Sequence, residues 1–154
     1  MGAVPYIIES PPSKTKETEM SDITNLELTI VTGGDDLRGD SSATAYIIVV
    51  NGDRTEEYST QLKSETDSSW GNDSTHGPIV WNMPPGVTTD NLFRFGIRLH
   101  SHENATETPD NWDITSVLAT YPVDGGGQAV LIDLAGGPLV RLTGSEPFWE
   151  TDVT

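Results

Sequence analysis

The stretch Thr32-Gly33-Gly34-Asp35-Asp36-Leu37-Arg38-Gly39-Asp40-Ser41-Ser42 (residues 32–42) lies between two apolar runs. Its glycines, carboxylates and hydroxyl groups are typical of a loop between two strands. Before the loop, residues 26–30 alternate between apolar and polar, as in a strand with one buried face. After it, residues 43–50 are more uniformly apolar and β-branched. This pattern predicts a central strand that ends at the Asn51-Gly52 turn signal.

Later segments show similar patterns. Apolar residues and turn signals predict further strands at residues 56–62, 79–83, 93–99, 114–121, 128–134 and 139–142. On the 93–99 strand, the odd-numbered residues from Phe93 onward are expected to face the core, and Arg94 and Arg98 to face outward and pair with acidic neighbours. Residues 63–78 are small or polar around Trp70, which predicts a long surface loop. No convincing amphipathic helix is present, so the sequence predicts an all-β fold, a single antiparallel β-sandwich of about eight strands.

The chain of 154 residues fits one domain, which we place at residues 22–154. Residues 1–21 are mostly polar and predict a flexible N-terminal arm. The arm also carries Tyr6, Ile7 and Ile8, which could dock on a neighbouring subunit or add a strand to a sheet edge. One alternative function is therefore that of a structural subunit in a larger assembly, a homo-oligomer joined through this arm. The alternative interpretation of the arm is a disordered leader.

Charge and composition restrict the possible partners. The formal net charge of -16 repels phosphate backbones and anionic lipid headgroups, which argues against nucleic acid as a partner. The same charge attracts cations and basic protein surfaces, although it could also serve solubility alone. With no cysteine there is no disulfide, thiolate metal site or cysteine nucleophile. We expect no cleavable signal in the opening residues, and no apolar run is long enough to span a membrane.

Two acidic segments could together form a calcium site. Calcium takes roughly six to eight oxygen ligands from carboxylates, amides, backbone carbonyls and water. The first segment provides Asp35, Asp36 and Asp40, and the second provides Asp110, Asn111 and Asp113. If the strands after both segments are neighbours, the carboxylates meet at one end of the sandwich and would repel each other without a cation. The alternative is that these residues only form turns, with Asp36 pairing with Arg38.

The order of several short motifs resembles that of the PLAT/LH2 β-sandwich family over residues 24–150. The motifs are Thr32-Gly33, the small-residue and β-branched strand that ends at Gly52, Trp112 at the start of a strand, and Phe148-Trp149 near the end. The resemblance implies a non-enzymatic module that binds lipid interfaces or proteins, often with calcium, and places ligands at Asp35, Asp36, Asp40 and Asp110. The first loop is more acidic than the lysine- and glycine-rich loop usual in that family.

A second resemblance involves the same acidic segments. Residues 35–39, together with the later segment 110–113, resemble a small domain appended to secreted bacterial proteins. This resemblance favours an extracellular or surface-associated location.

Other candidate sites depend on aromatic residues and histidines. Trp70 and Trp81 flank the long polar loop, and an exposed tryptophan can stack on a sugar ring, so a carbohydrate-binding module is a further alternative. His100 and His102 share a strand face beside Glu103, with His76 elsewhere, but a zinc site would need further ligands. No nucleophile elbow or phosphate loop is present, so no enzyme is predicted. The sequence therefore favours a non-catalytic calcium-binding module for adhesion or docking to a protein, glycan or lipid surface.

Overall fold

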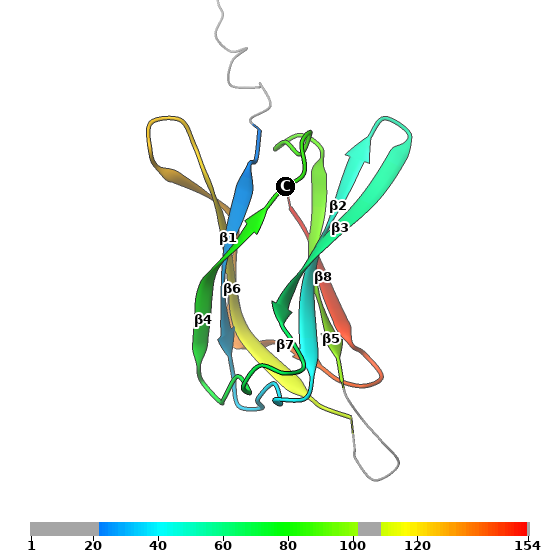
Figure 1. Ribbon diagram of the computed structural model, residues 1–154, viewed down its shortest axis with the longest axis vertical. Coiled ribbons are helices and arrows are strands. Elements are labelled where there is room, and N and C mark those ends of the chain that lie inside the picture. The colour runs from blue at the N-terminus through cyan, green and yellow to red at the C-terminus, as the bar shows by residue number, and fades with distance from the viewer. Residues whose placement is uncertain (1–21, 102–108, 154) are drawn as a thin grey trace, which may run out of the picture.

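The computed structural model describes residues 22–101 and 109–153, which form two four-stranded antiparallel sheets packed face to face (Figure 1). The strands are β1 (Asn25–Thr32), β2 (Ser42–Asn51), β3 (Arg54–Lys63), β4 (Thr75–Asn82), β5 (Leu92–His100), β6 (Trp112–Pro122), β7 (Gln128–Leu142) and β8 (Phe148–Asp152). One sheet has the order β4-β1-β6-β7 and the other β3-β2-β5-β8. The predicted all-β sandwich of eight strands is confirmed. The predicted arm, including Tyr6, Ile7 and Ile8, lies outside the described residues.

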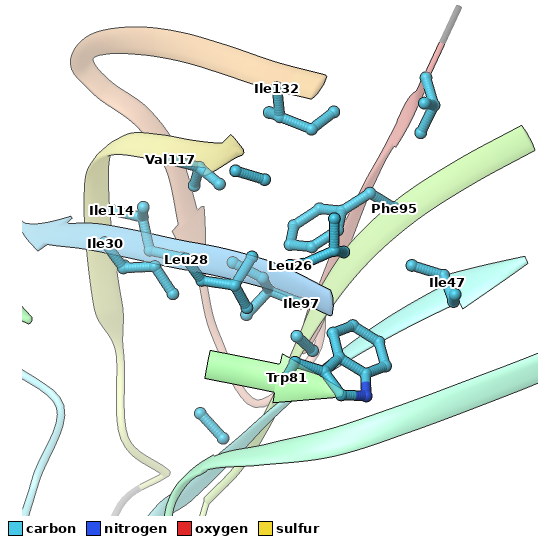
Figure 2. Close-up of a cluster of buried hydrophobic side chains, with 14 of the residues drawn as sticks. Leu26, Leu28, Ile30, Ile47, Trp81, Phe95, Ile97, Ile114, Val117 and Ile132 are labelled. Carbon is cyan, nitrogen blue, oxygen red and sulfur yellow. The ribbon is translucent and has the colours of Figure 1, made fainter. Parts of the chain in front are cut away.

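The core lies between the sheets and follows from the alternation in the sequence. Leu26, Leu28 and Ile30 of β1 are fully buried, whereas the residues between them are partly exposed. They pack with apolar side chains from both sheets, including Phe95 and Ile97 of β5 (Figure 2). Burial of these side chains supplies the main driving force for joining the two sheets. The described residues contain no helix that could cross a membrane.

The chain passes between the sheets four times at one end of the sandwich (Figure 1, bottom). Residues 33–41 lead from β1 to β2, residues 64–74 from β3 to β4, and residues 143–147 from β7 to β8; β5 ends and β6 begins at the same end of the sandwich. We call this end the crossover end. The connection from β4 to β5 and the two hairpins lie at the opposite end. The crossover end therefore brings together segments that are far apart in the sequence.

Several local predictions need correction. The segments 128–134 and 139–142 belong to one strand, β7, and the eighth strand is β8 near the C-terminus. The long loop ends earlier than expected, because Thr75 and His76 form backbone pairs with β1 although their side chains are polar. Phe93 is 49% exposed and does not share the core face of β5. A register shift in the pairing of β2 with β5, between Ile48 and Val49, accompanies this change of face.

The outward-facing arginines of β5 pair as predicted. Arg98 forms two hydrogen bonds with Glu57, of 2.8 and 3.0 Å, and Arg94 lies 3.8 Å from Glu150. Arg98 also covers the ring of Tyr46, with its guanidinium carbon 3.9 Å from the ring centroid. These contacts place the two positive charges of β5 among carboxylates of the neighbouring strands.

Candidate functional site at the crossover end

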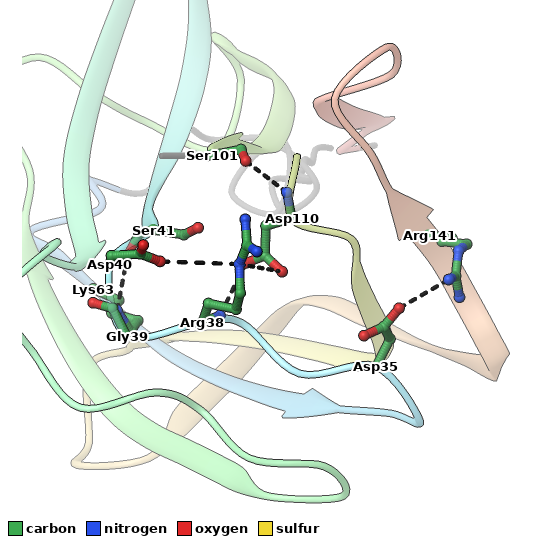
Figure 3. A network of polar contacts seen from close by, with 9 residues as sticks. All are labelled: Asp35, Arg38, Gly39, Asp40, Ser41, Lys63, Ser101, Asp110 and Arg141. Carbon is green, nitrogen blue, oxygen red and sulfur yellow. Dashed lines mark hydrogen bonds and ion pairs between the residues drawn. The ribbon is translucent and has the colours of Figure 1, made fainter. Parts of the chain in front are cut away.

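The two acidic segments meet at the crossover end, as the sequence predicts (Figure 3). The amide of Gly33 donates to the carbonyl of Asp113 at 2.8 Å, and the amide of Asp113 donates to the carbonyl of Asp35 at 3.0 Å. The amide of Arg38 donates to Oδ2 of Asp110 at 2.9 Å. Backbone hydrogen bonds between the β1–β2 connection and the start of β6 therefore fix the positions of the acidic side chains.

Asp110 is the most buried carboxylate of this group, with 3% of its surface exposed. Its Oδ1 lies 3.4 Å from Nε of Arg38, which is also 3.9 Å from Oδ1 of Asp40. Its own amide donates a 2.6 Å hydrogen bond to the hydroxyl of Ser101. Burial raises the pKa of the Asp110 carboxyl, and the hydrogen bond from the Arg38 amide acts in the opposite direction. Arg38 therefore pairs with Asp110 and Asp40, and not with Asp36 as the turn interpretation proposed.

Arg141 of β7 joins the other two acidic residues. Its Nη2 lies 2.8 Å from Oδ2 of Asp35, and its Nη1 lies 2.8 Å from Oδ1 of Asp113. One guanidinium thus binds a carboxylate from each of the two segments (Figure 3 shows its bond to Asp35).

Lys63, at the end of β3, belongs to this cluster, although the sequence did not identify it. Its side chain is only 1% exposed, and its ammonium donates to the carbonyls of Gly39, Ser41 and Ser64 at 2.9, 2.7 and 3.1 Å. Burial lowers the pKa of Lys63, while the nearby Asp67, Asp40 and Asp110 act in the opposite direction. A register shift between β2 and β3 lies next to the pair of Ala43 with Lys63. Strand alternation alone therefore does not reveal that this lysine points inward.

The geometry of this group does not fit a calcium site. Each of Asp35, Asp40, Asp110 and Asp113 already contacts an arginine. Within residues 22–101 and 109–153, no three acidic, histidine or cysteine side chains are grouped so that they could hold a metal ion. Asn111 instead lines a shallow surface hollow with Pro109 and the β7–β8 connection. The six predicted ligands share one end of the molecule, but they do not converge on a single point.

The side chains of Trp70 and Trp81, for which the sequence predicts ligand binding, are buried, with 7% and 6% exposed. Trp70 forms a two-residue β-bridge with Leu37, with backbone hydrogen bonds of 3.1 and 2.9 Å. Its ring stacks on His76 with the ring centroids 4.0 Å apart. The bridge holds the long polar loop against the sandwich, with the ring of Trp70 packed inside it.

The described histidines do not form a metal site. His76 lies on β4 and its Nε2 is 2.8 Å from the hydroxyl of Ser74. His100 lies on β5, in the other sheet, with its Nε2 3.0 Å from the hydroxyl of Thr44. His102 and Glu103 lie outside the described residues. The two sheets thus separate the described imidazoles that a zinc site would require together.

Comparison with known proteins supports the fold. No protein-family model matches the chain, and no curated protein matches its sequence. Two solved α-toxins are similar in structure. The toxin of Clostridium perfringens avian strain SWCP gives a TM-score of 0.56 at 13% identity, covering 87% of this chain and 32% of the toxin chain. The toxin of Clostridium absonum gives a TM-score of 0.54 at 12% identity, and the match covers 86% of this chain and 32% of the toxin chain.

The common feature is the β-sandwich. This chain spans about a third of the length of either toxin. At such low identity the likeness shows the fold alone, and it agrees with the sandwich architecture that the PLAT/LH2 resemblance implies.

Proposed function

We propose that this chain is a non-catalytic, PLAT-like β-sandwich module that docks on a basic surface of a protein partner. The observation that carries the proposal is that every basic side chain in the described residues is engaged within the chain. Arg54 pairs with Glu56, Arg94 with Glu150 and Asp152, Arg98 with Glu57, Arg141 with Asp35 and Asp113, Arg38 with Asp40 and Asp110, and Lys63 with backbone carbonyls.

The remaining carboxylates give the surface a negative potential. Glu65 and Asp73 are exposed at the crossover end, and Asp53 and Asp124 are exposed at the opposite end. With the basic groups of the described chain engaged and a net charge of -16, a basic protein surface is attracted, whereas an anionic bilayer is repelled. An extracellular or surface-associated location is part of the same proposal.

The other predicted functions have less support in the structure. Calcium dependence is not part of the proposal, because Arg38 and Arg141 already bind the carboxylates that would hold the ion. A carbohydrate site on Trp70 and Trp81 is not part of the proposal, because both side chains are buried. The assembly function depends on Tyr6, Ile7 and Ile8, which lie outside the described residues.

Binding to immobilised lysozyme and cytochrome c, two basic proteins, tests the proposal. An acidic protein and vesicles containing phosphatidylserine serve as comparison surfaces. We expect binding to the basic proteins that weakens with added salt, and none to the comparison surfaces. Binding to the vesicles alone would contradict the proposal.

Two double variants of equal net charge separate docking from general attraction. Glu65→Lys with Asp73→Lys changes the crossover end, and Asp53→Lys with Asp124→Lys changes the opposite end. Because rim charges act locally in a docked complex, we expect the first pair to weaken binding at least about threefold more than the second. Equal effects of the two pairs would show that only net charge matters and would rule out docking through the crossover end.

A further inference from the structure

We propose that Lys63, Arg38 and Arg141 are the fixed counter-ions of the crossover end, so that this end closes without calcium or another metal ion. Backbone carbonyls and carboxylates gathered at loops are the ligands that calcium prefers. In this molecule the same oxygens face an ammonium and two guanidinium groups. Three contacts support this assignment.

The ammonium of Lys63 uses backbone carbonyls that a metal ion would otherwise need. An ammonium has three N–H donors, and those of Lys63 reach three carbonyls at 2.7–3.1 Å. Two of these carbonyls, of Gly39 and Ser41, belong to the β1–β2 crossover, and the third, of Ser64, begins the β3–β4 crossover. The buried ammonium therefore ties two crossovers together and has its donors satisfied.

Arg141 binds both members of the pair of carboxylates that calcium would bridge. Asp35 and Asp113 come from different segments, and each accepts one 2.8 Å hydrogen bond from the same guanidinium. A guanidinium carries N–H donors on two terminal nitrogens, so one arginine side chain can bond two carboxylates at once. A calcium ion placed between Asp35 and Asp113 would have to displace this side chain.

Arg38 engages the buried carboxylate Asp110 from two directions. Its backbone amide binds Oδ2, and its Nε lies near Oδ1. The backbone carbonyls of Asp35 and Asp113 also accept backbone amides, so they are already engaged. Because Asp35, Asp110 and Asp113 already contact arginine side chains, a calcium ion would have to displace these contacts to gather six or more ligands.

Thermal unfolding of the full chain in calcium, and in EDTA, tests the proposal. Sodium chloride at matched ionic strength and magnesium serve as controls, because any added cation screens a protein of this charge. We expect the same Tm in calcium, magnesium and matched salt, and no loss on chelation. A calcium-specific rise in Tm that Asp113→Asn abolishes would overturn the proposal, since a ligand that binds only the folded state must stabilise it.

Removing one counter-ion provides an independent test. Arg141→Met keeps the aliphatic volume but leaves Asp35 and Asp113 facing each other. Arg54→Met is the matched control, because Arg54 is largely exposed and pairs with Glu56 alone on β3. We expect Arg141→Met to lower Tm by about 2–4 °C more than the control. Equal Tm values for the two variants would overturn the counter-ion role, whereas a calcium response that appears only in Arg141→Met would support it.

Discussion

The backbone amide of Arg38 donates a 2.9 Å hydrogen bond to the carboxylate of Asp110, which lies 72 residues away in the sequence. The bond joins the connection between β1 and β2 to the segment that precedes β6. Both connections cross between the sheets, so this contact helps hold the two sheets in register at the crossover end. A carboxylate in this position has a structural role whether or not a partner binds nearby.

Substitutions at Asp110 should therefore reduce stability strongly. Asp110→Ala removes the acceptor of the Arg38 amide and one ion-pair partner of the Arg38 guanidinium, and we expect a loss of about 3 kcal/mol in the free energy of unfolding. Asp110→Asn keeps one acceptor oxygen and should cost less than the alanine variant. Urea unfolding measures both, with exposed Asp133→Asn as the control. Equal losses for the alanine and control variants would contradict this role.

Gly96 lies under the ring of Tyr46, and a Cβ at this position would overlap the ring. We expect Gly96→Ala to lower the free energy of unfolding by about 1–3 kcal/mol, because the ring and the Arg98 side chain above it would have to move. Gly127→Ala is the control, since its Cβ would have ordinary van der Waals contact with Val123. In a double-mutant cycle, the cost of Gly96→Ala should shrink when Tyr46 is replaced by Ala. An unchanged cost would show that the ring is not the obstacle.

His76 should make stability depend on pH. Burial lowers its pKa from the ordinary value near 6.5, so the folded state favours the neutral imidazole stacked on Trp70. The stabilisation is present above the unfolded pKa of about 6.5 and is lost as the pH falls through the lower folded pKa. His76→Gln should flatten this part of the stability profile. An NMR titration of the ring protons checks the direction, and a raised pKa for His76 would contradict it.

Trp70 should act in folding and not in ligand binding. Its ring packs on His76 and meets Trp112 edge-on, with centroids 5.7 Å apart. We expect Trp70→Ala to lower the free energy of unfolding by about 3–5 kcal/mol, and Trp70→Phe to lower it clearly less. Fluorescence of the intact protein should not respond to soluble glycans. A glycan-induced change that Trp70→Phe removes would restore the carbohydrate interpretation.

The sequence by itself determined the strands and the face that most of them bury. Alternation with a period of two is a local property, so residues 26–30 predict the core side of β1 without any knowledge of its neighbours. Glycine turn signals are local too, and Gly52, with a φ of +63°, forms the turn between β2 and β3 as expected. The order of the acidic segments even predicted that they meet at one end.

Only the tertiary structure decided what those acidic residues bind. A carboxylate in a loop can hold a metal ion, form a turn or pair with a base, and the choice depends on which side chains arrive from distant strands. Here Arg141 arrives from β7 and Lys63 from the end of β3, next to a shift in strand register that strand periodicity does not encode. The backbone bridge between Leu37 and Trp70 also joins residues far apart in the sequence, and the side chain of Trp70 is buried there. Contacts between residues far apart in the sequence thus join the predicted calcium loops to arginine and lysine side chains of the same chain.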